Sequence, residues 1–185
     1  ISADGNPAVE YTFSIPLDIR HPETGDPILF VGRFDMLGSY NGLPGVVDEK
    51  TTQRMTGGGT QWDLRGQFMG YCWACQQMGT GVNMAYVREI GIYAKDYKVQ
   101  THIIQFPQHL IDRWAAQLYV DVAQMKRAYE FKSNEGIDYW YPYNFADACS
   151  AYGGCAFSSL CLAKDPSAYF SSFSNYRWNP LAKQP

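Results

Sequence analysis

Residues 8–15 (AVEYTFSI) alternate between apolar and polar side chains, and this period of two restricts the start of the chain to a strand. The apolar positions are held by Val9, Tyr11, Phe13 and Ile15. Successive side chains of a strand point to opposite faces, so one face is apolar and the other polar. The pattern therefore predicts a β-strand with one buried face.

Two further segments continue the β pattern. Residues 28–37 (ILFVGRFDML) and 46–52 (VVDEKTT) are predicted strands, because turn-rich stretches separate them from each other and from the first strand. Three consecutive strands of this kind predict a meander. The segment 61–78 (QWDLRGQFMGYCWACQQM) then has helical length, contains no proline and is apolar on nearly all sides, which predicts a buried helix.

The rest of the chain adds two strands and one long helix. Residues 82–94 and 98–106 are predicted strands. An amphipathic helix is predicted from Pro107, with an apolar stripe at helical spacing made of Ile111, Trp114, Leu118, Val122 and Met125. The chain has the length of one domain with a sizeable core. We expect a single mixed α/β domain over residues 1–185, made of a core (about 8–106), a helix (about 107–132) and a cysteine-bearing tail (about 139–185).

Charge and composition limit which partners and which cellular location are expected. The formal net charge of −3 gives no general attraction to phosphate, so nucleic-acid contacts require a local basic patch. No apolar run reaches the ~18 residues of a membrane span and no signal-peptide pattern is present, so a cytosolic protein without membrane association is expected. The start at Ile1, just before a strand, indicates that an N-terminal region is missing. Candidate basic patches are Arg88, Lys95 and Lys98, or Arg113, Lys126 and Arg127.

The stretch GVVDEKTT places three charges on a predicted strand of the sheet. Residues two apart in a strand share a face, so Asp48 and Lys50 point one way and Glu49 the other. Asp35 lies on the preceding strand, and an antiparallel hairpin brings its carboxylate close to that of Asp48. Two adjacent carboxylates repel each other unless a cation lies between them.

A hard divalent cation fits this acid pair. Mg²⁺ prefers oxygen ligands at about 2.1 Å and is held by one or two carboxylates together with phosphate and water. A metal of this kind activates water and stabilises charge on a phosphate, and Lys50 is placed to assist. The alternative for an isolated D-x-K tripeptide is a solvated strand end, so the neighbouring motifs decide between the two interpretations.

Three motifs occur in one order along the chain: Gly32-Arg33-Phe34-Asp35, Asp48-Glu49-Lys50, and a helix with Gln67 and Tyr71 one turn apart. This G-x-x-D, (D/E)-x-K, Q-x-x-x-Y series resembles the PD-(D/E)XK nuclease superfamily, specifically its RecB-like and lambda-exonuclease-like branch. The resemblance implies a restriction-endonuclease-like core, in which a central mixed β-sheet is flanked by helices.

The resemblance also implies a function and a role for each matching residue. The implied activity is Mg²⁺- or Mn²⁺-dependent hydrolysis of DNA phosphodiester bonds, by an exonuclease of recombination, repair or phage DNA processing that acts with a helicase, recombinase or other DNA-processing protein. Asp35 and Asp48 would bind metal and Lys50 would be catalytic. The remaining implied roles are a carbonyl ligand from Glu49, and positioning of the site or the DNA strand by Gln67 and Tyr71.

Two assignments stay open. Glu10 matches a glutamate often found on the strand before G-x-x-D in this branch, so it is either a further metal or second-layer carboxylate or an exposed strand residue. A chain with this fold could also be a DNA-binding or structural module without turnover, although Asp35, Asp48 and Lys50 are all present.

The cysteines suggest a second metal site. Cys149, Cys155 and Cys161 follow one another with five residues between each pair, one thiolate short of a closed site. Some RecB-like nucleases hold a 4Fe-4S iron–sulfur cluster with three C-terminal cysteines and one before the nuclease core, so these three are either iron–sulfur or zinc ligands or unpaired cysteines. Cys72 and Cys75, inside the apolar helix, are expected to be core residues. An iron–sulfur or zinc protein with an incidental acidic strand is the third functional alternative.

Overall fold

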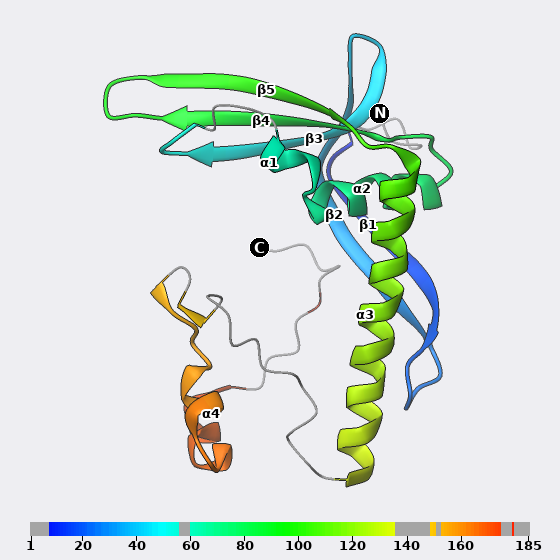
Figure 1. Ribbon diagram of the computed structural model, residues 1–185, viewed down its shortest axis with the longest axis vertical. Helices are drawn as coiled ribbons and strands as arrows, with labels where there is room; N and C mark the ends of the chain where they lie inside the picture. The colour runs from blue at the N-terminus through cyan, green and yellow to red at the C-terminus, as the bar shows by residue number, and fades with distance from the viewer. Residues whose placement is uncertain (1–7, 56–59, 136–148, 151–152, 175–178, 180–185) are drawn as a thin grey trace.

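The computed structural model describes residues 8–55, 60–135, 149–150, 153–174 and 179. A five-stranded sheet forms the centre, with strand order β1-β2-β3-β4-β5 (Figure 1). The strands are β1 (Val9–Arg20), β2 (Pro27–Tyr40), β3 (Leu43–Thr52), β4 (Met84–Ile92) and β5 (Tyr97–Gln105). The helices are α1 (Thr60–Asp63), α2 (Gly66–Gln77), α3 (Gln108–Glu135), α4 (Ser158–Leu162) and the 3₁₀ helix η4 (Pro166–Ser172).

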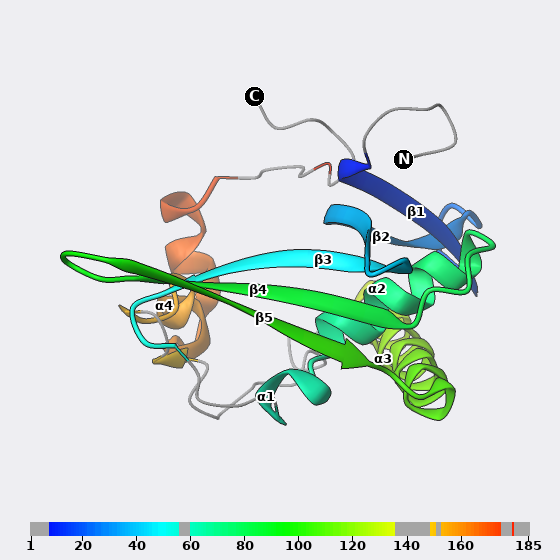
Figure 2. The same ribbon diagram turned by 90° about the horizontal axis from the view of Figure 1, so that it is seen from above.

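The sheet is mixed, as predicted. β1, β2 and β3 form the expected antiparallel meander, and β4 and β5 form an antiparallel hairpin. β3 and β4 are parallel, and the chain crosses between them through α1 and α2. Figure 2 shows α2 and α3 on one side of the sheet. This arrangement confirms the prediction of a mixed α/β fold of the restriction-endonuclease-like kind.

The first strand is longer than its predicted end at residue 15. The buried alternation of Phe13 and Ile15 continues to Leu17, and after a shift in register the strand pairs again with β2 at Arg20↔Pro27. The turn that was expected from residue 18 is therefore confined to the residues between β1 and β2.

The predicted helix over residues 61–78 is wrong in one respect, because it is two helices. The chain leaves the helical conformation at Arg65, which has extended backbone angles (φ −72°, ψ 112°). The break lets α1 turn aside, so that Trp62 is buried against Phe68 and the ring of His102. Tertiary packing of Trp62 thus overrides the continuous helical pattern.

The core lies between the sheet and α2. Phe34, Val46 and Val87 from the strands meet Phe68 and Cys72 from α2, and all five are fully buried. α3 adds Ile111 and the partly buried Trp114 near its start. A Cβ at Gly70 would lie only 2.7 Å from the Trp114 ring, so α2 and α3 approach more closely than any other residue at position 70 would allow.

The far half of α3 extends past the core (Figure 1). Met125, which the sequence places on the apolar stripe of this helix, is 67% exposed. The end of α3 touches the β1–β2 turn, where the rings of His21 and Tyr129 lie 5.4 Å apart. Within the described part of the chain, no helix combines the length and apolar character that a bilayer span needs.

Candidate active site

Asp48 is the centre of the site. It lies on β3 facing α2, and only 1% of its surface is exposed. Gln67 Nε2 donates a hydrogen bond of 3.0 Å to Asp48 Oδ1. The Lys50 ammonium lies 2.7 Å from Oδ2 as an ion pair, and among the described residues Oδ2 has no further polar partner. A carboxylate oxygen can accept more than one partner, so Oδ2 keeps capacity for a second positive ligand beside Lys50.

Asp35 lies beside Asp48 as predicted. The β2–β3 ladder pairs Met36 with Val47, so Asp35 is one step farther along and level with Asp48. Its Oδ2 accepts a 3.3 Å hydrogen bond from the backbone N–H of Glu49. The hairpin thus holds two carboxylates on adjacent strands.

The electrostatics of the pair favour a positive occupant. Burial raises the pKa of Asp48 above its ordinary value, and the negative charge of Asp35 raises that pKa further. Lys50 and the Gln67 hydrogen bond lower the pKa, but they do not cancel the effect of burial. An added divalent cation would favour the ionised form of both carboxylates.

α2 holds Asp48 in place through Gln67 and Tyr71. The Gln67 amide also donates to Tyr71 Oη over 3.2 Å, and the Tyr71 hydroxyl donates to the Arg33 carbonyl over 3.0 Å. These two side chains share a helix face because they are four residues apart. The network connects β3, α2 and β2, the three elements that carry the predicted motifs. Burial raises the pKa of Tyr71, so its hydroxyl stays protonated and can donate.

The two other predicted acidic residues have partners of their own. The Glu10 carboxylate lies 2.7 Å from Arg33 Nε and is largely exposed, and Glu10 itself has a left-handed backbone conformation (φ 51°). The Glu49 side chain lies 2.8 Å from Arg88 Nη1, on the face of the sheet opposite to Asp48. Glu49 contacts Asp35 through its backbone N–H, whereas its side chain pairs with Arg88.

The residues present fit a hard divalent cation. Two carboxylates offer oxygen ligands, and Asp48 Oδ2 is a buried oxygen whose one partner among the described residues is the Lys50 ammonium. In the described part of the chain, no three His, Cys, Asp or Glu side chains are grouped for metal binding. The remaining ligands would then be backbone, water or phosphate oxygens, which is the usual situation for Mg²⁺. Asp35 and Asp48 are the residues that would hold it.

Sequence reasoning missed a second buried polar pair next to the site. On β4, Glu89 is level with Lys50 and only 2% exposed, and His102 Nε2 on β5 lies 2.9 Å from its carboxylate. Trp62 covers the His102 ring. The alternation of side chains in this strand was the available signal, because it places Glu89 on the helix-facing side of the sheet. The signal was weak, since a single glutamate between apolar strand residues is usually exposed.

The predicted basic patch is divided between the two faces of the sheet. Arg88 lies on the outer face with Glu49, whereas Lys98 pairs with Gly91 on the face that carries Asp48 and Lys50. Lys95 lies in the turn between β4 and β5. The site and this hairpin therefore share one face through Lys98.

The cysteines fall into two groups. Cys72 and Cys75 are buried in the core, as predicted, and burial raises the thiol pKa values to about 12 and about 11. Cys149 and Cys161 are exposed and Cys155 is half-buried. No grouped metal-binding set includes these three among the described residues, and an iron–sulfur or zinc site stays a prediction.

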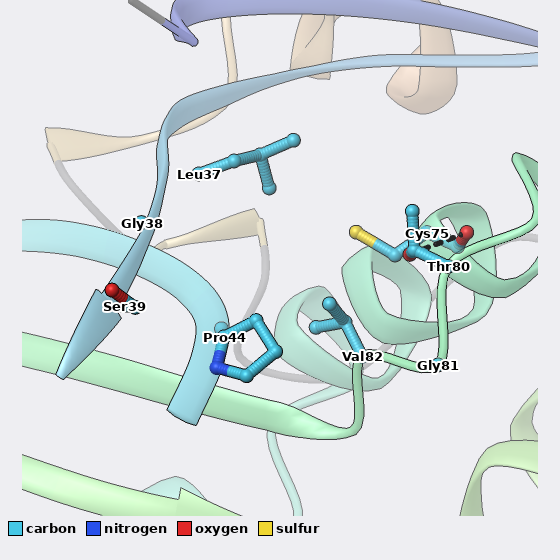
Figure 3. Close-up of a pocket in the computed structure, with 9 residues that line it drawn as sticks. Leu37, Gly38, Ser39, Pro44, Cys75, Thr80, Gly81 and Val82 are labelled. Carbon is cyan, nitrogen blue, oxygen red and sulfur yellow. Dashed lines mark hydrogen bonds between the residues drawn. The ribbon is translucent and has the colours of Figure 1, made fainter. Parts of the chain in front are cut away.

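A separate cavity of about 490 Å³ lies at the other end of α2. Figure 3 shows its lining from the β2–β3 hairpin, with Leu37 and Pro44, and from the end of α2 and the following loop, with Cys75, Thr80 and Val82. Among the residues that the structure describes, no carboxylate, histidine or basic side chain lines it. It does not supply acid–base or metal chemistry, and the buried Asp48 site remains the candidate active site.

A mixed sheet in which two adjacent strands carry an acid pair and a lysine defines the class of fold as restriction-endonuclease-like. A sequence profile of the PD-(D/E)XK nuclease superfamily matches residues 5–162, which is most of the chain. The chain therefore belongs to the PD-(D/E)XK nuclease superfamily.

Other comparisons add little. The crystal structure of SSO0001 is similar with a TM-score of 0.38 and 16% sequence identity, over 60% of this chain and 48% of that chain. This chain thus spans about half the length of SSO0001. No curated protein sequence is significantly similar to the chain.

Proposed function

We propose that this protein is a Mg²⁺- or Mn²⁺-dependent deoxyribonuclease that hydrolyses DNA phosphodiester bonds. The observation that carries the proposal is the buried carboxylate of Asp48, which lies next to a second carboxylate, Asp35, and has Lys50 2.7 Å from its Oδ2. Such a charge arrangement costs folding free energy, and sites of this kind are concentrated where chemistry is performed. Membership of a nuclease superfamily supports the assignment of this chemistry to phosphodiesters.

Each residue has a defined task in this proposal. Asp35 and Asp48 hold the metal, with the carbonyl of Glu49 as a further ligand. When bound, the divalent cation supplies an activated water and neutralises charge on the scissile phosphate. Lys50 now pairs with Asp48 Oδ2, and its ammonium is within reach of a phosphate held at the same carboxylate. Glu10 can join the ligands only after it leaves Arg33.

Gln67 and Tyr71 act as positioning residues. Gln67 fixes the orientation of the Asp48 carboxylate, and Tyr71 anchors Gln67 to the backbone of β2 through the Arg33 carbonyl. This network engages Asp48 Oδ1 and leaves Oδ2 to Lys50 and, in this proposal, to the metal. Hydrogen bonds of this type orient metal ligands and tune their affinity.

The proposed mode of action is exonucleolytic digestion in recombination, repair or phage DNA processing, together with a helicase, recombinase or other DNA-processing protein. The ordered series of three motifs supports this choice, because the series as a whole, with the Q-x-x-x-Y pair on α2 as its last member, resembles the RecB-like and lambda-exonuclease-like branch. The network between Gln67, Tyr71 and Asp48 gives that motif a physical role.

The test compares DNA with and without ends. Wild-type protein in Mg²⁺ or Mn²⁺ is expected to release nucleotides from linear DNA and to leave closed circular DNA intact, while Asp48→Ala and Lys50→Ala release almost none. Cleavage of circular DNA would show an endonuclease instead. Equal release by wild type and both variants, or no release by any of them, would contradict the proposal, and metal-free binding of DNA without release would indicate an inactive module.

A further inference from the structure

The helix-facing side of the sheet continues beyond the candidate site along the β4–β5 hairpin. Lys50 is level with Glu89, and two residues farther Thr52 is level with Gly91, which pairs with Lys98. Because residues two apart share a face, Lys98 lies on the same face as Lys50. We call the end of this hairpin, residues 91–98, the arm; it projects from the body of the sheet in Figure 1.

The arm and the adjacent end of β3 carry three exposed cations: Arg54, Lys95 and Lys98. None of the three has an ion-pair partner within the described residues. Asp96 in the same turn accepts a hydrogen bond from the Tyr97 N–H and offsets one of these charges, so the three cations still leave a positive excess. In a chain with net charge −3, this local excess of positive charge is an exception that attracts an anion.

The arm also carries an aromatic ring, Tyr93. A Cβ added to Gly91 would lie 2.7 Å from Met55 Cγ and 2.9 Å from the Tyr93 hydroxyl, so the side chains of Met55 and Tyr93 both lie over Gly91 on the helix-facing side. Tyr93 is 39% exposed and has no ring partner among the described residues. A residue with a side chain at position 91 would displace Met55 or Tyr93, so Gly91 allows both to lie on the face that carries Lys98.

The opposite face of the same hairpin has a different character. Arg88 is neutralised by Glu49, and the exposed side chains beyond it are apolar or aromatic, including Ile92, Val99 and Tyr97. The free charge of Lys98 and the partly exposed Tyr93 ring therefore occur on the helix-facing side, which also carries Asp48 and Lys50.

We propose that the arm binds the single-stranded stretch of DNA next to the scissile phosphate, with Lys98 and Arg54 on its phosphates and a base stacked on Tyr93. This inference rests on the proposed nuclease function. Bases can stack on a side chain only where they are not stacked in a duplex, and a basic track with aromatic rings is how proteins hold single strands. Lys50 and Lys98 share one face of the sheet, so a strand bound along that face would run from the arm towards Lys50.

The first test measures the affinity for fluorescein-labelled single-stranded DNA by anisotropy, in Ca²⁺ in place of Mg²⁺. Tyr93→Ala is expected to weaken binding about tenfold, the size of one lost stacked base. Tyr97→Ala, a change of the same size on the opposite face, is the matched control and should change the affinity less than twofold. Lys98→Ala should lower the slope of log affinity against log salt by about 0.7, whereas Lys164→Ala should not.

A second readout separates the arm from the active site. Hydrolysis of bis(p-nitrophenyl) phosphate, which is too small to reach the arm, should be unchanged in Tyr93→Ala and lost in Asp48→Ala. Wild-type affinity in both Tyr93→Ala and Lys98→Ala would overturn the inference even if DNA is hydrolysed. Absence of any hydrolysis by the wild type would instead contradict the nuclease proposal, and the binding measurements would still decide the role of the arm.

Discussion

The central residue of this protein is a carboxylate in an unfavourable place. Asp48 is buried among Val46, Val87 and α2, and its charge is offset only in part by Lys50. Its pKa is raised, which means that the folded chain without metal binds a proton there more tightly than the unfolded chain does. A bound cation would offset the free-energy cost of this buried charge. A substitution that removes the charge should therefore raise the stability of the metal-free protein and lower its activity.

Asp48→Asn should therefore stabilise the metal-free protein at neutral pH. The stabilisation from a protonated Asp48 is fully present below the unfolded pKa near 3.8 and is lost as pH rises through the raised folded pKa. Urea unfolding in EDTA at several pH values should show that, as pH rises through the raised pKa of Asp48, the free energy of unfolding of the wild type falls below that of Asp48→Asn. Added Mg²⁺ should raise the stability of wild type alone. A less stable Asp48→Asn at pH 7 would contradict this assignment.

Gln67→Ala should weaken metal binding while the fold is kept. Loss of the amide removes the hydrogen bond to Asp48 Oδ1 and the link to Tyr71, and positioning residues of this kind are typically worth about 10–100-fold in metal affinity or activity. Calorimetric titration with Mn²⁺ measures the effect. Gln76→Ala, on the same helix but paired with Gln108, is the control and should bind Mn²⁺ like wild type.

At the scale of elements, α2 connects the core with the site. Its N-terminal half carries Gln67 and Tyr71 towards the strands, and Gly70 on the same helix allows Trp114 of α3 to approach. The position of Asp48 and its network thus depends on close contact between two helices. A shift of α2 would move Gln67 away from the carboxylate.

Gly70→Ala should destabilise the protein by about 1–3 kcal/mol, because the new methyl group would lie 2.7 Å from the Trp114 ring and overpack this contact. Gly81→Ala is the matched control: Gly81 has nothing within 4 Å of an added Cβ, and its change should stay within about 0.5 kcal/mol. Equal unfolding free energies for the two variants would show that the helices do not pack in this way.

The thiols of α2 should be unreactive in the folded state. Burial raises the pKa of Cys72 to about 12 and that of Cys75 to about 11, so almost no thiolate is present at pH 8. In metal-free protein, a disulfide reagent at pH 8 should modify Cys149, Cys155 and Cys161, and should reach the other two only in guanidinium chloride. Rapid modification of all five without denaturant would contradict the burial of α2.

The sequence predicted an element correctly where the burial of its apolar side chains imposes a recognisable pattern on the residues. The alternation in β1 and the apolar surface of α2 predicted those elements, because both pack against the same core. The break at Arg65 could not be predicted, since it depends on Trp62 reaching His102 on a strand 40 residues later. Met125 continues the apolar spacing of α3 and is nevertheless exposed, because helical spacing does not show how far along the helix the core extends.

At the scale of the whole molecule, the site is assembled from segments that are distant in sequence. β2, β3 and α2 supply Asp35, Asp48 with Lys50, and Gln67 with Tyr71, and the antiparallel hairpin followed by a parallel crossover brings them together. The spacing of the motifs predicted which residues meet. It could not predict the hydrogen bond from Tyr71 to the Arg33 carbonyl, because a backbone acceptor leaves no trace in side-chain patterns.

Topology also explains what the sequence did not indicate about Glu89 and Lys98. Both lie on the helix-facing side only because β4 runs parallel to β3 and β5 returns antiparallel to β4, which sets Lys50, Glu89 and Lys98 on one face. The basic residues Arg88, Lys95 and Lys98 are close in sequence, but strand alternation separates Arg88 from Lys98. Whether charged residues that are close in sequence form one surface patch depends on strand alternation and on the pairing register of the strands.

The most direct measurement is the initial rate of nucleotide release from linear DNA as a function of Mg²⁺ concentration, for wild type, Asp48→Asn and Lys50→Ala. We expect no release in EDTA, saturable release by wild type, and rates for Lys50→Ala lower by about 10²–10³, the size of a lost charge-stabilising group. Asp48→Asn should not respond to Mg²⁺ even though it is folded. Release that needs no metal, or that survives both substitutions, would contradict the assignment of catalysis to this site.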